Sequence, residues 1–185
     1  ESSATVTLKE GLSSLGTGSC TGGTVTITSS VLSEGNHSIK ASQADTAGNV
    51  SSESSTLSIT IDTTLPTITS VSSDKTNGSY TTGEVIDIDV TFSETVTSTG
   101  SVTVTLETGA TDRTCTFTVT SASTGTCNYT VQAGDTTSDL EVSSIAGTIA
   151  DTSGNAMTNF VPVTNLAANK AIVIDTTAPS APSTP

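Results

Sequence analysis

Residues 86–92 read IDIDVTF, a strict alternation of apolar and polar side chains. Because successive side chains of a β-strand point to opposite faces, this stretch predicts a strand with one apolar face and one largely acidic face. Similar alternating runs recur on both sides of it, at residues 57–61, 102–106, 115–119 and 127–131. Turn-forming pairs such as Asn77-Gly78 and Thr108-Gly109 separate them. The sequence therefore predicts an all-β fold built from short antiparallel strands.

Composition narrows the classes of function. The formal net charge of −13 would repel the phosphates of nucleic acid, so no nucleic-acid partner is expected. The sequence has no run of about 18 apolar residues, and no membrane span is expected. Aromatic residues make up 3% of the chain, so each core must be thin and built mainly from Val, Ile and Leu. A bound ion or a disulfide would be a useful supplement to such a core.

Two short motifs occur twice, in the same order. Asp-Thr-x-Gly-Asn occupies residues 45–49 and 151–155, and Ile-Asp-Thr-Thr-x-Pro occupies residues 61–66 and 174–179. This recurrence predicts tandem modules. We expect a partial module at residues 1–62, a complete module at 63–175, and at 176–185 a linker to, or the start of, a next module. The first module has strand-like runs at 4–9, 24–29, 37–43 and 56–61, too few to close a sandwich of about seven strands. It is therefore expected to be incomplete at its N-terminus.

These stretches resemble the bacterial immunoglobulin-like (Ig-like) domains of large repetitive cell-surface adhesins. The first module carries LSEGNHSIKASQADTAGNVSSESSTLSITIDTT, and the second carries GSYTTGEVIDIDVTFSETVTSTG, YTVQAGDTTSDLEV and ADTSGN. The resemblance implies tandem Ig-like antiparallel β-sandwiches, with neighbouring Ig-like modules of the same protein as partners. It also implies an extracellular location, on the bacterial surface or secreted, and a non-catalytic role in a stalk. In such arrays, some junctions between modules bind calcium, which stiffens the stalk.

By the same resemblance, acidic loop and linker positions are predicted to hold Ca²⁺. Calcium takes about six to eight oxygen ligands, and an Asp-x-x-Gly-Asn loop offers carboxylate, amide and carbonyl oxygens. We expect the linker aspartate to add a second carboxylate at the same end of the module, with Glu84 or Asp74 of the next module as further candidates. The alternative is that these side chains only cap turns by accepting bonds from backbone N–H groups. The predicted ligands are Asp45, Asn49, Asp62, Asp151, Asn155 and Asp175.

The three cysteines predict one disulfide. Cys115 and Cys127 would face the same way if their strands pair as a hairpin through residues 121–125. A disulfide closing this short loop would stabilise the fold by up to about 3 kcal/mol. Two buried free thiols are the alternative. Cys20 lies in a Gly-rich turn, and we expect its partner to lie in missing strands or in another chain.

No enzymatic activity is expected. The one histidine, His37, enters a predicted strand, where a structural role is favoured over a catalytic triad. Asp87 and Asp89 are expected to form a solvated surface, and scarce aromatics count against a glycosidase cleft or a glycan-binding module. The predicted function is a calcium-stiffened stalk module. The alternative is a homo-polymer, a filament or surface-layer subunit whose incomplete first module accepts a strand from a neighbour.

Overall fold

The computed structural model describes residues 3–182 and divides the chain into two compact units, Glu1–Thr63 (unit 1) and Thr64–Pro185 (unit 2). Almost all regular structure in the described residues is β-strand. The one helix there, α1 (Leu166–Asn169), is a single turn capped by Asn165, whose side chain accepts from the N–H of Leu166. The predicted all-β fold with antiparallel sheets is confirmed. No helix in the described part of the chain is long and apolar enough to cross a membrane.

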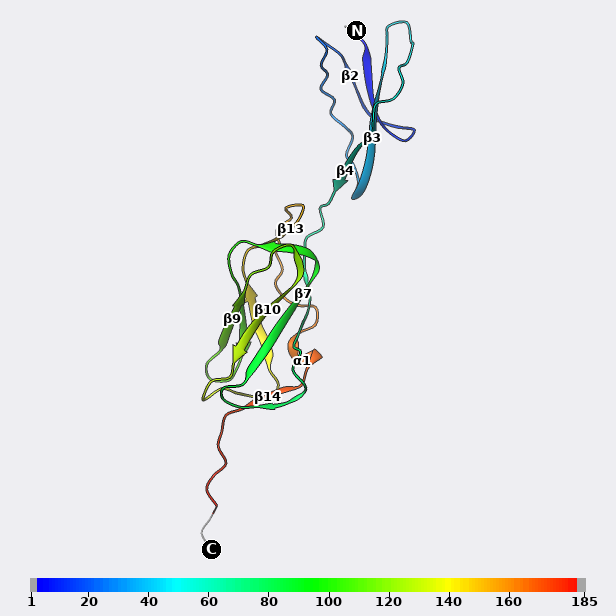
Figure 1. The fold of residues 1–185 in the computed structure, drawn as a ribbon. Coiled ribbons are helices and arrows are strands. Elements are labelled where there is room, and N and C mark those ends of the chain that lie inside the picture. The colour runs from blue at the N-terminus through cyan, green and yellow to red at the C-terminus, as the bar shows by residue number, and fades with distance from the viewer. Residues whose placement is uncertain (1–2, 183–185) are drawn as a thin grey trace. The chain divides into compact units, whose positions relative to one another are not determined.

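Unit 1 is one antiparallel sheet with the strand order β2-β1-β3-β4 (Figure 1). Its strands are β1 (Thr5–Glu10), β2 (Ser13–Ser19), β3 (Gly35–Ala44) and β4 (Leu57–Ile61). The strand predicted at residues 24–29 is wrong, because this segment forms no ladder with the sheet. The glycine-containing β2, which has no alternating pattern, pairs with β1 instead. Gly16 and Gly18 let residues 25–28 lie against β2, since a Cβ on either glycine would come within 2.7 Å of that segment.

Few side chains of unit 1 are buried. Among its described residues, Ala4 and Ile39 are the buried apolar side chains, and His37 and Ser42 are the buried polar ones. Other apolar residues of the sheet are half-buried or exposed, such as Leu57, which is 60% exposed. Unit 1 therefore has a sheet without a dense apolar core.

Unit 2 is a β-sandwich (Figure 1). One sheet is centred on β7 (Val85–Ser98), which pairs with β5 (Ile68–Ser72), β10 (Ala122–Thr130) and β13 (Ile149–Asp151). A second sheet has the order β12-β8-β9, from β12 (Glu141–Ala146), β8 (Val102–Glu107) and β9 (Arg113–Phe117). A small third sheet joins β11 (Thr136–Thr137), β14 (Ile172–Asp175) and β6 (Gly78–Tyr80), with β14 parallel to β6.

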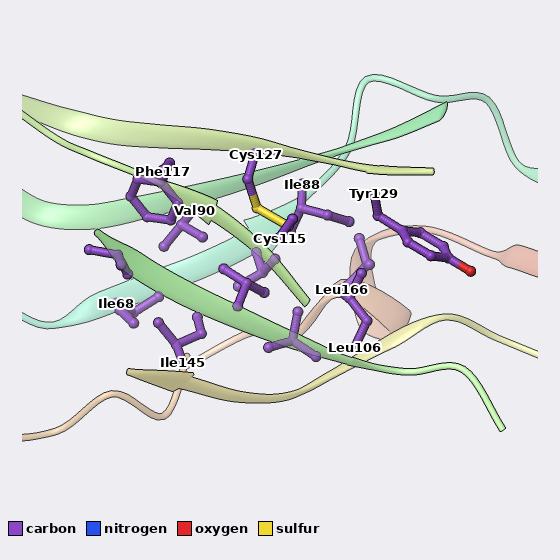
Figure 2. Close-up of a cluster of buried hydrophobic side chains, with 14 of the residues drawn as sticks. Ile68, Ile88, Val90, Leu106, Cys115, Phe117, Cys127, Tyr129, Ile145 and Leu166 are labelled. Carbon is purple, nitrogen blue, oxygen red and sulfur yellow. A yellow bond between two sulfur atoms is a disulfide. The ribbon is translucent and has the colours of Figure 1, made fainter. Parts of the chain in front are cut away.

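The core of unit 2 follows directly from the alternation in β7. Ile86, Ile88 and Val90 are completely buried. Ile88 and Val90 lie among apolar side chains of the facing sheet such as Leu106 and Phe117 (Figure 2). The polar positions between them point to the other face of the sheet. The period-2 pattern thus predicts both the strand and its buried face.

The predicted disulfide between Cys115 and Cys127 is present, with the two Cα atoms 5.6 Å apart (Figure 2). The hairpin expected to carry it is not formed. Cys115 lies in β9 and Cys127 in β10, which follow each other along the chain but belong to different sheets. The bond therefore joins the two layers of the sandwich. Cys20 carries a free thiol and is partly exposed.

Candidate metal-binding loops

The loop of residues 45–49 directly follows β3 and is closed by the side chain of its first residue. Oδ1 of Asp45 accepts from the backbone N–H groups of Ala47 (2.9 Å) and Asn49 (2.8 Å). Oδ2 accepts from the side-chain amide of Asn49 (2.8 Å). Gly48 has a φ of 88°, a left-handed conformation that glycine adopts at least cost. Asp, Gly and Asn each have a separate role in holding this turn.

The loop of residues 151–155 follows β13 and has the same hydrogen bonds. Oδ1 of Asp151 accepts from the backbone N–H groups of Ser153 and Asn155, both at 2.8 Å. Oδ2 accepts from the side-chain amide of Asn155, also at 2.8 Å. Gly154 has a φ of 96°. The repeated motif therefore encodes one loop structure in two different units.

Both loop aspartates are held in the ionised form. The side-chain amide of Asn49, followed by backbone N–H groups, lowers the pKa of Asp45 below its ordinary value. Burial acts to raise the pKa of Asp151, but hydrogen bonds from Asn155, Ser153 and Gly154 outweigh it and the net pKa is lowered. Charged carboxylates of this kind are the ligands that calcium prefers.

The carboxylate of Asp45 is already largely occupied. An ionised carboxylate offers about four lone-pair positions, and three hydrogen bonds use Asp45 to close its turn. A shallow depression of about 240 Å³ borders the loop and is lined by polar residues that include Gln43, Asn49 and Ser51. The loop can thus contribute about one carboxylate contact to a cation, and the other ligands would have to come from elsewhere.

In unit 1, the loop and terminal aspartates lie at opposite ends of the sheet. Asp62 follows β4, whose last residue, Ile61, pairs with Gly35 at the start of β3. Asp45 follows the other end of β3, nine residues further along the chain. At about 3.3 Å per residue, the two positions are separated by roughly 30 Å.

Unit 2 separates its two aspartates in the same way. Asp151 ends β13 and pairs with Val96 near the C-terminal end of β7. Asp175 ends β14, pairs with Thr136 and accepts a hydrogen bond from the backbone N–H of Thr177 (2.9 Å). Strands β13 and β14 lie at opposite ends of the sandwich (Figure 1).

The expectation that both aspartates of one module share an end is therefore wrong for both units. Asp45 is brought together with Asn49, and Asp151 with Asn155, but neither loop meets the terminal aspartate of its own unit. In unit 1 the physical reason is the antiparallel pairing of β3 with β4, which returns the chain to the start of β3 before the unit ends. In unit 2, Asp151 and Asp175 lie on strands of different sheets. Metal binding by these six residues stays a prediction.

One group of acidic residues was not predicted from the sequence. One carboxylate oxygen from each of Asp74, Asp87 and Asp89 lies within 4.8 Å of the other two in unit 2. The spacing of Asp87 and Asp89 places them on one strand face, but only the pairing of β5 with β7 brings Asp74 to them. Asp87 accepts from the backbone N–H of Asp74 (2.6 Å), and Asp89 accepts from the hydroxyl of Thr126 (2.5 Å). These hydrogen bonds hold the carboxylates of Asp87 and Asp89 in place within the fold itself.

Comparison with protein families adds one finding. Residues 1–63 match the family model described as a bacterial Ig-like domain, and this segment is the whole of unit 1. Domains of this kind are structural, typically non-catalytic and often exposed at the cell surface. No curated protein matches the chain.

Proposed function

We propose, on the premise that residues 1–63 belong to the bacterial Ig-like domain family, that this chain is a structural stalk segment of an extracellular adhesin. The observation that carries the proposal is the Asp-Thr-x-Gly-Asn loop, which has the same hydrogen bonds in two successive β units. Repetition of one structural plan along a chain extends the chain without adding a reactive site. A stalk requires that property.

The surroundings of the one histidine support a non-catalytic role. Both ring nitrogens of His37 are engaged, one by the carboxylate of Glu10 and the other by the carbonyl oxygen of Ser33. A general base needs a nitrogen that can reach a substrate proton. His37 offers neither nitrogen for that purpose.

The finer part of the proposal is that calcium binding by these modules stiffens the stalk. Both loops present an ionised carboxylate, and calcium is coordinated by carboxylate, amide and carbonyl oxygens. With a formal net charge of −13, the chain also repels itself, and a divalent cation would relieve that repulsion.

A second candidate function, a subunit of an extracellular filament, is favoured by the exposed apolar positions of unit 1. Leu57 of the edge strand β4 is 60% exposed, and the unit has few buried apolar side chains. A strand from a neighbouring copy could pair with such an edge and cover such residues. This function would produce polymers, whereas a stalk segment acts as a monomer.

Light scattering and titration calorimetry on the 185-residue chain, with and without calcium, test the proposal. We expect an 18.4 kDa monomer at all protein concentrations and a calcium affinity of about 10⁻⁴ to 10⁻³ M, as in extracellular modules. Asp45→Asn keeps the oxygen that closes the loop and removes its charge, so it should weaken this affinity by roughly tenfold, because calcium affinity depends on the number of charged ligands. The exposed Asp112, outside both motifs, gives the control Asp112→Ala, which should leave the affinity unchanged.

The possible results separate the two parts of the proposal. Polymers that grow with protein concentration would contradict the stalk function and support the filament function. A monomer that releases no heat with millimolar calcium would agree with the stalk function and contradict calcium binding. Equal affinities for Asp45→Asn and the unchanged chain would exclude Asp45 as a ligand.

A further inference from the structure

His37 is held between two groups that can only accept hydrogen bonds. It lies in β3 and is 8% exposed. Nδ1 is 3.0 Å from both carboxylate oxygens of Glu10 in β1, and Nε2 is 2.9 Å from the backbone carbonyl oxygen of Ser33. An ionised carboxylate and a carbonyl oxygen carry no proton to donate.

This arrangement selects one protonation state of the ring. A neutral imidazole has one N–H group and one bare nitrogen, so it satisfies either Glu10 or Ser33 but not both. The other contact would then place two lone pairs against each other in a nearly buried site. Only the imidazolium form, with two N–H groups, donates to both partners.

The residue opposite His37 and the lysines of the sheet do not replace these partners. Across the sheet, His37 pairs with Ile59 of β4, which is apolar. Lys9 and Lys40 pair with each other on the opposite face of the sheet, and Lys40 contacts Glu53 at 3.1 Å. Glu10 is thus the charged group in hydrogen-bonding contact with the ring.

We propose that His37 is a pH-dependent clamp: the doubly protonated ring ties the Ser33 segment to β1, and loss of one proton releases one of the two ties. The clamp acts on the end of unit 1. Glu34, next to Ser33, accepts hydrogen bonds from the backbone N–H (3.0 Å) and the hydroxyl (2.6 Å) of Thr63, the last residue of the unit. Protonation of His37 therefore fixes the segment that holds the C-terminal end of unit 1.

The direction of the pH effect follows from the two contacts. The carbonyl of Ser33 and then the carboxylate of Glu10 raise the pKa of His37 above the ordinary 6.5. Its stabilising contribution is complete below pH 6.5 and is lost as the pH rises through the raised pKa. The hydrogen bond from His37 lowers the pKa of Glu10 below 4.5, so the contribution of Glu10 is present above pH 4.5 and is lost as the pH falls through the lowered value. The clamp is therefore tightest at mildly acidic pH.

Nuclear magnetic resonance on the full chain tests the clamp. Because His37 is the one histidine of the sequence, the imidazole signals need no assignment between residues. We expect a titration midpoint above 6.5, with both nitrogens protonated below it. Amide exchange of Ser38, whose N–H donates to Glu10 at 3.3 Å, should accelerate roughly 2- to 10-fold across the same midpoint, after correction for intrinsic base catalysis.

A matched pair of variants tests whether Glu10 sets the titration midpoint of His37. Glu10→Gln should lower the midpoint and shift the exchange transition of Ser38 with it. Glu53→Gln removes a carboxylate that contacts Lys40 instead, and it should leave the midpoint unchanged. A wild-type midpoint at or below 6.5 would overturn the clamp. Exchange rates that do not follow the imidazole titration, or a midpoint unmoved by Glu10→Gln, would overturn it as well.

Discussion

Asp135 is 1% exposed in unit 2 and yet carries a negative charge. Its carboxylate accepts from Nε of Arg113 (2.8 Å), the hydroxyl of Tyr129 (2.7 Å) and the backbone N–H of Gln132 (2.9 Å). Burial acts to raise the pKa of Asp135, but these three donors outweigh it and lower the pKa. Burial, followed by the contact with Asp135, raises the pKa of Tyr129, which therefore remains a donor. A buried charge is stable here because three donors satisfy its carboxylate.

Asp135→Ala should lower the free energy of unfolding of unit 2 by about 3 kcal/mol, since it leaves Arg113 and Tyr129 without their shared partner. Urea unfolding followed by tyrosine fluorescence measures the loss, because Tyr80 and Tyr129 both lie in unit 2. The exposed neighbour Asp112 gives the control, and Asp112→Ala should stay within about 0.5 kcal/mol. Equal losses in the two variants would contradict the role assigned to the network.

The same residue has an effect on acid stability. Because the folded pKa of Asp135 is lowered below 3.8, its contribution is present above pH 3.8 and is lost as the pH falls through the lowered value. Asp135→Asn should therefore show a weaker dependence of stability on pH below 3.8 than the unchanged chain.

At the scale of elements, the relation between β9 and β10 decides how the sandwich is held together. The sequence places Gly125 in a turn, but the structure places it inside β10, beneath the ring of Phe117. A Cβ at Gly125 would lie 2.1 Å from an atom of that ring, so glycine is needed there for close approach of the two layers. Gly125 was therefore predicted to lie in a turn, because the local sequence does not reveal that Phe117 packs against it.

Removal of the disulfide should destabilise unit 2. The bond closes a loop with a sequence separation of 12, which corresponds to about 3 kcal/mol in the chain-entropy account. The double variant Cys115→Ala/Cys127→Ala should lose about this amount in urea unfolding followed by tyrosine fluorescence. Reductant should shift the unfolding of the unchanged chain but not that of the double variant. Cys20→Ala is the control, and this variant should keep the reductant effect. If the substitution abolished the effect, the effect would come from Cys20 and not from the disulfide.

At the scale of the whole molecule, the two units differ in how much apolar surface they bury. The described residues of unit 1 contain two buried apolar side chains, Ala4 and Ile39, whereas β7 alone buries a row of them in unit 2. All five aromatic residues also lie in unit 2. Because burial of apolar surface is the main stabilising contribution to folding, unit 1 should be the less stable part of the chain.

We expect two separate unfolding transitions in urea, with unit 1 first. Far-ultraviolet circular dichroism reports both units, whereas tyrosine fluorescence reports unit 2 alone, so the two signals should not coincide. Ile39→Ala should lower the first transition and Ile88→Ala the second, each by about 2 to 4 kcal/mol. Coincident transitions, shifted together by either substitution, would show that the chain unfolds as one cooperative unit.

The sequence by itself determined the all-β class, the buried face of β7 and the recurrence of one loop motif. Each of these depends on a local pattern, such as a period of two residues or a turn that closes within five. Only the tertiary structure decided which sheet β9 and β10 join, where the aspartates of each unit lie, and that Glu10 contacts His37 from 27 residues away. These features depend on strand order and register, which arise from packing between distant segments and leave no periodic trace in the sequence.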